Sequence, residues 1–175
     1  MTGDLQPLSA SAPAAFTAFY HQAVGDVYRY FFRSTGGQRG IAEDLTQETF
    51  LAAVHAFNGG QPDAFTRPWI FGVARHKLID HYRRQTREQT KLTMVWNDTG
   101  GSEVLVPPGF TEADAVELLA DLPPLHRLVL TLRYLDDLPV AEIGPLIGRS
   151  FSATQSMLLR ARRSLERRLE EVHDA

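Results

Sequence analysis

Basic side chains are the most informative residues of this sequence, because most of them gather in two short segments. Ten of the eighteen Lys and Arg residues lie there, in a chain whose formal net charge is −3. Two separated basic patches on an acidic background predict two local contacts with a polyanion. The alternative is that both segments are ordinary solvated helix faces, because a single run of charged residues is more often a solvated face than a binding site. The two groups are Arg75, Lys77, Arg83, Arg84 and Arg87, and Arg160, Arg162, Arg163, Arg167 and Arg168.

Other kinds of chemistry find little support in the residue types. The chain has no cysteine, which excludes disulfides and thiolate metal sites. His76 and Asp80 lie one helical turn apart, which allows two metal ligands, but no third ligand is evident. A surface ion pair between Asp80 and Arg84 is the favoured interpretation. An enzyme acting on nucleic acid would need a Gly-rich phosphate loop or paired carboxylates, and neither is found. We therefore expect no cofactor, no metal site and no catalytic residue.

The apolar residues repeat at helical spacing, so the basic residues are expected to lie on helices. No convincing alternation of apolar and polar residues, as in a strand, is found. The periodicity fails across 89–110, where glycine and proline pairs indicate a linker. The predicted fold is all-α, with two small helical domains at 12–88 and 111–173 joined by this flexible linker. Thr111 and Asp114 resemble a capping box at the start of the second domain. Helices are predicted at about 13–34, 42–57, 66–87, from 111 onward, 124–135, 140–147 and 151–172.

The predicted helix at 42–57 carries one narrow stripe of mixed character. At roughly 100° per residue, two acids, an amide, a leucine and a histidine fall along it, while the other apolar side chains face largely inward. An exposed leucine among polar groups suits a protein docking surface. A plain solvated face explains the spacing equally well. The stripe consists of Asp44, Gln47, Glu48, Leu51 and His55.

The predicted helix at 66–87 has an apolar arc on one side and a basic and aromatic arc on the opposite side. Cations that bind phosphates, beside an aromatic ring that can stack, are what single-stranded or melting DNA needs. Phe65 lies in the preceding segment, where a loop could hold an unstacked base. For Trp69, covering the core is an equally good interpretation. The basic arc collects Trp69, His76, Lys77, Arg83, Arg84 and Arg87, with Asp80 among them.

The segment 139–160 has the outline of a helix-turn-helix. A short apolar helix ends at Gly148, and Ser150 is placed to cap a second helix. On that second helix, small polar residues near the start can reach base edges, and arginines further along can reach phosphates. A helical hairpin with a basic surface is the weaker interpretation. The outward face carries Ser152, Gln155, Ser156, Leu159, Arg160, Arg163 and Arg167.

Three segments together resemble the extracytoplasmic-function (ECF) sigma factors. Residues 42–50, AEDLTQETF, are similar to the polymerase-binding helix of that family, and 68–84, PWIFGVARHKLIDHYRR, to its promoter-melting helix. Residues 121–134, DLPPLHRLVLTLRY, with the helix-turn-helix after them, are similar to its second domain. The resemblance covers nearly the whole chain in the family's order.

The resemblance implies a non-enzymatic sigma factor that binds core RNA polymerase and directs promoter-specific initiation. The residues expected to contact the β′ clamp helices of the polymerase are Asp44, Leu45, Gln47, Glu48 and Leu51. Those expected to open and read the −10 element are Phe65, Trp69, Arg75, His76, Lys77, Arg83 and Arg84. Those expected to read the −35 element are Ser152, Gln155, Ser156, Leu159, Arg160 and Arg163.

The expected partners are core polymerase, through the β′ clamp helices and the β flap, and promoter DNA. Family members are often held inactive by an anti-sigma protein, which is a further candidate partner. No apolar run is long enough to span a bilayer and no secretion signal is evident, so we expect a cytoplasmic protein without membrane contact. A stand-alone helix-turn-helix regulator is the alternative, but it leaves the helices at 42–57 and 66–87 unexplained.

Three features depart from the family pattern. His76 replaces an asparagine that is common in the −10 helix. The recognition helix reads SATQSM at 152–157, where the family usually has Gly-Thr-Val-Lys-Ser-Arg, so two cations are missing. Pro145 lies inside the first helix of the helix-turn-helix and removes a backbone donor, which predicts a kink or a shortened helix.

Overall fold

The computed structural model describes residues 11–59, 65–89 and 111–173, and within these ranges it contains helices and turns but no strand. The all-α expectation is confirmed. Residues 90–110, nearly all of the predicted linker, lie outside the described part of the chain. The helices are α1 (Ser11–Ser34), α2 (Arg39–Asn58), α3 (Arg67–Gln89), α4 (Glu112–Ala120), α5 (Pro124–Leu130), the π-helical turn η2 (Thr131–Leu135), α6 (Val140–Ile147) and α7 (Phe151–His173).

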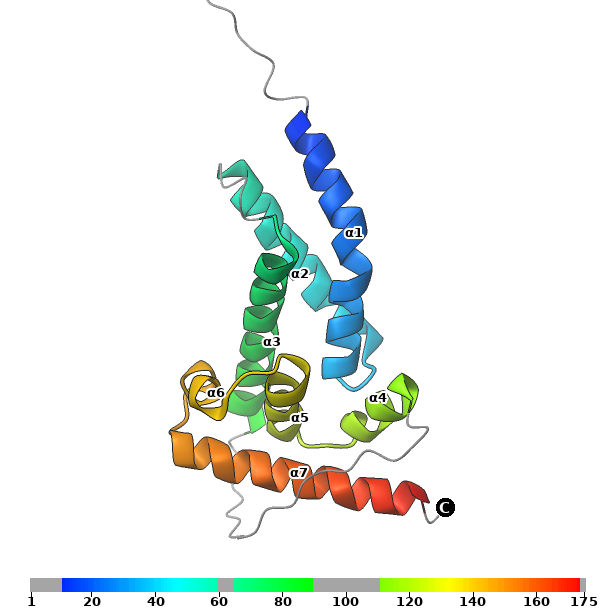
Figure 1. The fold of residues 1–175 in the computed structure, drawn as a ribbon, viewed down its shortest axis with the longest axis vertical. Coiled ribbons are helices and arrows are strands. Elements are labelled where there is room, and N and C mark those ends of the chain that lie inside the picture. The colour runs from blue at the N-terminus through cyan, green and yellow to red at the C-terminus, as the bar shows by residue number, and fades with distance from the viewer. Residues whose placement is uncertain (1–10, 60–64, 90–110, 174–175) are drawn as a thin grey trace, which may run out of the picture.

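Helices α1, α2 and α3 form an N-terminal bundle in which each helix packs on the other two (Figure 1). The apolar arc predicted for α3 faces this bundle, where Leu78 and Tyr82 are buried in one hydrophobic cluster with Val27 and Phe31 of α1. The hydroxyl of Tyr82 donates a hydrogen bond to the backbone oxygen of Ser34, 2.5 Å away. Burial raises the pKa of Tyr82 to about 12, so this hydroxyl stays protonated and remains a donor.

Local polar signals start and stop the C-terminal helices as the sequence predicts. The Thr111 hydroxyl accepts from the backbone N–H of Asp114, whose carboxylate accepts from the N–H of Thr111, so the capping box is confirmed. Ser150 caps α7 by accepting from the N–H of Ala153 at 3.3 Å. Gly148 ends α6 in the left-handed conformation, with φ at 69°, which favours glycine.

The helix-turn-helix is formed by α6 and α7, which pack closely at one position. A Cβ on Gly144 would lie 3.0 Å from the backbone oxygen of Arg149 and 3.2 Å from Oγ1 of Thr154. Glycine therefore lets the turn and the first part of α7 approach α6. Helix α6 runs for eight residues with Pro145 inside it. The long α7 lies across the end of the molecule beneath α5 (Figure 1).

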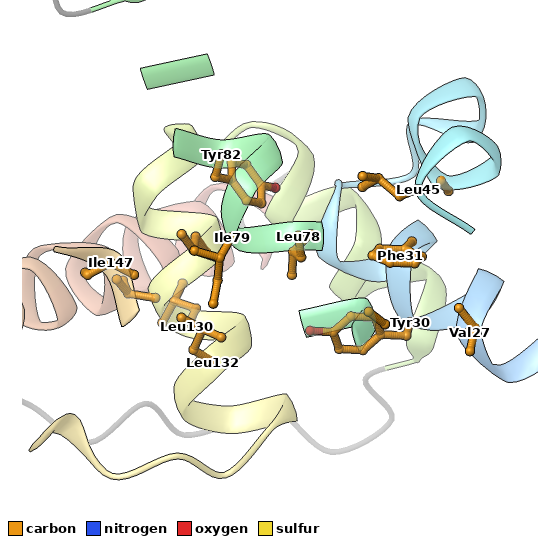
Figure 2. Packing of buried hydrophobic residues seen from close by; sticks show 14 of the residues in the cluster. Val27, Tyr30, Phe31, Leu45, Leu78, Ile79, Tyr82, Leu130, Leu132 and Ile147 are labelled. Carbon is orange, nitrogen blue, oxygen red and sulfur yellow. The ribbon is translucent and has the colours of Figure 1, made fainter. Parts of the chain in front are cut away.

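The N-terminal and C-terminal parts share one hydrophobic core. Helix α5 packs on α7 and also on α3, and α6 touches α3 as well. Ile79 of α3 is buried in the same cluster as Leu130, Leu132 and Ile147, and the four side chains lie together in Figure 2. Gly36, after α1, lies so close to α4 that a Cβ would be 2.5 Å from Cα of Ala120. The sequence alone did not predict this contact between the two parts.

We expect the packing of α5 on α7 to weaken in mild acid because of His126. This half-buried ring lies 3.4 Å from the Ser164 hydroxyl. Burial, and then the nearby Arg160, lower the pKa of His126 below its usual 6.5. The unfolded chain therefore takes up the proton first, so the stabilisation present above about pH 6.5 is lost as the pH falls through the folded-state pKa.

Thermal unfolding at pH 7.5 and pH 5.5 measures this effect. The fall in Tm between the two values should be smaller in His126→Gln than in the natural chain. Substitution of His81 is the matched comparison for substitution of His126, because burial, and then Arg84, also lower the pKa of the His81 ring. An equal fall in Tm for the natural chain and for His126→Gln would show that His126 makes no contribution.

Candidate protein and nucleic-acid interfaces

Helix α2 presents the predicted stripe to solvent. Asp44, Gln47 and His55 are exposed, and Leu51 is 52% exposed although its side chain is apolar. Glu48 is half-buried, and its carboxylate lies 3.3 Å from Nζ of Lys77 on α3. The stripe therefore combines two acids, an amide and an accessible leucine on one rigid helix, which suits contact with a protein surface.

Leu45 does not belong to this surface. The expectation that it touches the polymerase is wrong, because its side chain is only 2% exposed and lies in the hydrophobic core of the N-terminal bundle. On a helix, position 45 follows Asp44 by about 100°, which turns it from the stripe towards α1 and α3. Leu45 supports the stripe by fixing α2 against its neighbours.

An apolar groove runs beside the stripe, between α1 and α2. It has a volume of about 650 Å³ and is open to solvent. Leu51 and Gln47 of the stripe belong to its rim, so the groove and the stripe form one continuous surface. Its apolar lining comes from Phe16, Tyr20, Val24 and Tyr28 of α1 and from Phe50, Leu51 and Val54 of α2.

The cations predicted on α3 differ in how they are held. Arg84 is exposed, and Lys77 is paired with Glu48. Arg75 donates from Nε to Asp136 of the C-terminal part at 3.2 Å, and Arg83 donates to the backbone oxygen of Leu146 in α6. Three of the predicted −10 residues, Arg75, Lys77 and Arg83, are therefore engaged by the chain itself.

Two smaller polar features of α3 also bear on the predictions. Asp80 lies 3.9 Å from Arg83, three residues on, so the pair predicted with Arg84 is corrected. Nδ1 of the exposed His76 lies 2.8 Å from the backbone oxygen of Gly72. In the part of the chain that the structure describes, His76 and Asp80 gain no third candidate metal ligand.

Phe65 and Trp69 belong to an aromatic cluster at one end of the N-terminal bundle. The Phe65 ring lies 5.5 Å from Phe16, 5.7 Å from Phe57 and 5.9 Å from Trp69, between ring centroids. Both predicted stacking residues are half-buried. Their rings fix the start of α3, and Trp69 remains partly accessible to solvent.

Helix α7 presents its predicted face at the start of the helix. Ser152, Gln155 and Ser156 are exposed, whereas Leu158 and Ala161 are buried in the hydrophobic core. Further along, Leu159, Arg160 and Arg163 are half-buried. Small polar groups thus come first and arginines follow, which is the order expected of a helix that enters a groove by its N-terminal end.

The periodicity of the sequence missed two residues that connect the two parts of the molecule. Asp136 accepts from Tyr30 of α1 and Arg75 of α3. Arg127 is 5% exposed, and its guanidinium donates to the backbone oxygens of Thr35, Ala120 and Leu122. These partners lie as much as 106 residues apart, so no local pattern indicates them.

Comparison with known families matches both parts of the chain. The family model for Sigma-70 region 2 matches residues 19–88, and that for Sigma-70 region 4 matches residues 113–165. The ECF RNA polymerase sigma factor SigM of Bacillus subtilis is 32% identical over 152 residues, which are 84% of this chain and 90% of SigM. The chain belongs to the ECF sigma factor family.

A second relative of this sigma factor is SigF of Caulobacter vibrioides, which is 37% identical over 145 residues, or 82% of this chain and 79% of SigF. The sigma factor binds core RNA polymerase and directs promoter-specific transcription initiation. The match to region 2 covers the helices that a stand-alone helix-turn-helix regulator would leave unexplained, so that alternative is not favoured.

Two solved structures share the fold of this sigma factor. RpoE of Bartonella quintana, in complex with the anti-sigma factor NepR, superposes with a TM-score of 0.53 at 16% identity, over 89% of this chain and 97% of RpoE. CnrH, in complex with the cytosolic domain of CnrY, gives 0.50 at 24% identity, over 93% and 94%. Among the described helices, none is both long and apolar enough to cross a membrane.

Proposed function

We propose that the α2 stripe and the neighbouring groove form the surface through which this sigma factor binds the β′ clamp helices of core polymerase. The 52% exposure of Leu51, one helical turn after Gln47 and Glu48 of the stripe, is the observation that carries the proposal. A helix laid along the groove would bury Leu51 and the apolar lining together, while Asp44 and Glu48 contact polar or basic groups at the rim.

Helix α3 is proposed to open and read the −10 element. Lys77, Arg83 and Arg84 attract phosphates, and the partly accessible ring of Trp69, on the same helix, can stack on an unstacked base. Leu45 is not among the proposed contacts, and Phe65 chiefly supports Trp69, because Phe65 sits among four other rings. Domains at 12–88 and 111–173, joined across 89–110, complete this division of labour.

The start of α7 is proposed to read the −35 element in the major groove. Ser152, Gln155 and Ser156 are exposed there, and Gly148 and Ser150 fix the direction from which the helix begins. Arg160 and Arg163 contact the flanking phosphates. All of these roles are binding roles, so the sigma factor acts without chemistry of its own, in the cytoplasm where the polymerase works.

An anti-sigma protein is proposed as a further partner. Of the two structural neighbours, RpoE was solved in complex with the anti-sigma factor NepR, and CnrH in complex with the cytosolic domain of CnrY. The apolar groove beside Leu51 is accessible to such a partner as well as to the polymerase. Competition between the two for one surface would keep the sigma factor from its polymerase.

Run-off transcription tests the function as a whole. The sigma factor would be mixed with core polymerase and a library of genomic fragments, and the 5′ ends of the transcripts would be sequenced. We expect initiation from a small set of fragments that share two motifs spaced as −35 and −10 elements. Transcription that does not depend on the added sigma factor, or starts without shared motifs, would contradict the proposed promoter recognition.

We predict that Gln155 sets the base preference at one −35 position. An amide both donates and accepts, which matches the major-groove edge of adenine. Gln155→Ala in the holoenzyme should lose about 1–3 kcal/mol of discrimination at that base. Gln155→Lys should bind many sequences more tightly and steepen the salt dependence by about one ion. Selection of −35 variants against each holoenzyme measures both effects.

Ser152→Ala is the control, because Ser152 is exposed on the same turn and has no amide. It should leave the preference read by Gln155 in place. An unchanged preference in Gln155→Ala would show that this side chain only faces solvent.

A further inference from the structure

One carboxylate joins the two parts of the molecule through a small buried network. Oδ2 of Asp136, directly after η2, accepts a hydrogen bond from the Tyr30 hydroxyl at 3.1 Å and from Nε of Arg75 at 3.2 Å. The Asp136 side chain is only 8% exposed, and that of Arg75 is 28% exposed. Tyr30 and Arg75 lie in the region 2 match, whereas Asp136 lies in the region 4 match.

Other contacts near this network also join the N-terminal and C-terminal parts. Ile79 of α3 is buried against the cluster that contains Leu130 and Ile147 (Figure 2). Arg127 reaches across from α5 to the backbone oxygen of Thr35, at 2.6 Å. Apolar side chains from both parts thus meet at this interface, and Asp136 adds a charged contact whose geometry is specific.

A π-helical turn places Asp136 at this point. The five residues of η2 precede it, and its backbone N–H donates to the oxygen of Thr131, 3.0 Å away. Turns of this kind are rare within helices and are frequent at functional sites. A regular continuation of α5 would carry position 136 to a different direction around the helix axis, so the irregular turn decides where the carboxylate points.

The interface between the two parts involves residues of α3 that are proposed to bind promoter DNA. Arg75 is held by Asp136, Arg83 donates to the backbone oxygen of Leu146, and Ile79 between them is buried. One side of α3 is therefore covered by α5, by α6 and by Asp136. A DNA strand that follows this side of α3 cannot reach Arg75 while region 4 stays in place.

We propose, on the basis of the promoter-binding role given to α3, that the free sigma factor is closed upon itself and that Asp136 is the latch. Asp136 substitutes for a DNA phosphate as the anionic partner of Arg75. Opening breaks the Arg75 and Tyr30 contacts and moves region 4 away from α3. A phosphate then takes the place of the carboxylate, so DNA binding and opening favour each other.

Loss of the latch is tested by a distance in the free chain. Since the chain lacks cysteine, Arg39→Cys and Glu117→Cys can carry two spin labels without background labelling. Both positions are exposed, and they flank the place where a Cβ on Gly37 would lie 2.8 Å from Val116. We expect one short distance in the natural chain and a broader, longer distribution in Asp136→Asn, which keeps the shape of the side chain and removes its charge.

Asp137→Asn is the matched control. Asp137 carries the same charge next in the chain, but it is paired with Arg133 of the same part, 3.4 Å away, and is largely exposed. It should keep the short distance. Tyr30→Phe, which removes a single hydroxyl, should shift part of the population and shows an effect even if Asp136→Asn proves poorly folded. Distances that stay short in both Asp136→Asn and Tyr30→Phe would overturn the latch.

Binding of the free chain to a single-stranded −10 oligonucleotide tests what the latch conceals. If the closed form holds nine-tenths of the chain, opening should tighten binding by up to about 10-fold, because apparent affinity scales with the open fraction. Adding Arg75→Ala to Asp136→Asn should remove much of this gain. A longer distance without tighter binding would show that the interface does not mask α3.

The proposed function is tested separately by run-off transcription with the Asp136→Asn holoenzyme. We expect transcription close to that of the natural protein, since Asp136 is not among the residues proposed to contact polymerase or DNA. Absent transcription from the natural holoenzyme would contradict the promoter role itself, whereas unchanged distances would contradict only the latch.

Discussion

Reversing two charges on α2, Asp44→Arg with Glu48→Arg, is expected to abolish binding to core RNA polymerase. Both side chains belong to the stripe around the exposed Leu51. A complementary surface that meets acids there would instead meet two cations, and the loss should be at least about 100-fold in affinity. A pull-down with core polymerase, at several salt concentrations, measures it.

The fold should survive this change, because neither side chain is buried. Glu48 loses its pair with Lys77, which is a surface contact worth little to stability. Glu117→Arg with Glu170→Arg is the matched control, since it makes the same change in net charge at two exposed positions on α4 and α7. The control should bind normally. Normal binding by the α2 variant, with unchanged helicity by circular dichroism, would rule out the stripe as the polymerase surface.

Local sequence signals were sufficient for most helices of this sigma factor. The capping box at Thr111, the glycine after α6 and the cap at Ser150 each act within a few residues, so the sequence carries the whole signal. The exposure of the α2 stripe also follows from helical geometry. Helix α2 begins at Arg39, three residues before the predicted start. This start was missed because the residue before it, Gln38, is not a typical capping residue and makes no side-chain cap.

The contact between the two parts could not be predicted in the same way. In the sequence, nothing distinguishes Asp136 from the other acids of an acidic stretch. Only the tertiary arrangement brings it to Tyr30 and Arg75. The π-helical turn that aims it was predicted as ordinary helix, because its residues carry the same apolar pattern as α5. Leu45 shows the converse error: a resemblance placed it at a surface that its own helical position excludes.

On α3, we expect the arginines and the aromatic rings to fail at different steps of promoter binding. Arg83→Ala with Arg84→Ala should weaken binding of the holoenzyme to promoter DNA. Two lost phosphate contacts should lower the dependence of log affinity on log salt by about 1.8, at 0.9 for each contact with duplex DNA. Arg29→Ala with Arg39→Ala is the control, because it removes the same charge outside α3 and α7.

Trp69→Ala should instead leave the first, double-stranded complex nearly intact. A ring contributes nothing to phosphate attraction, so the salt dependence should be unchanged, but a stacked base can be worth about 1–3 kcal/mol once the strands separate. Permanganate reactivity of thymines at −10 should therefore fall, while binding to closed promoter DNA persists. Trp69 also packs on Phe65, so its variant must first be shown to keep its Tm near that of the natural chain. If the arginine and tryptophan variants lose binding and melting in equal proportion, cations and rings act together on α3, and the separation of attraction from opening is wrong.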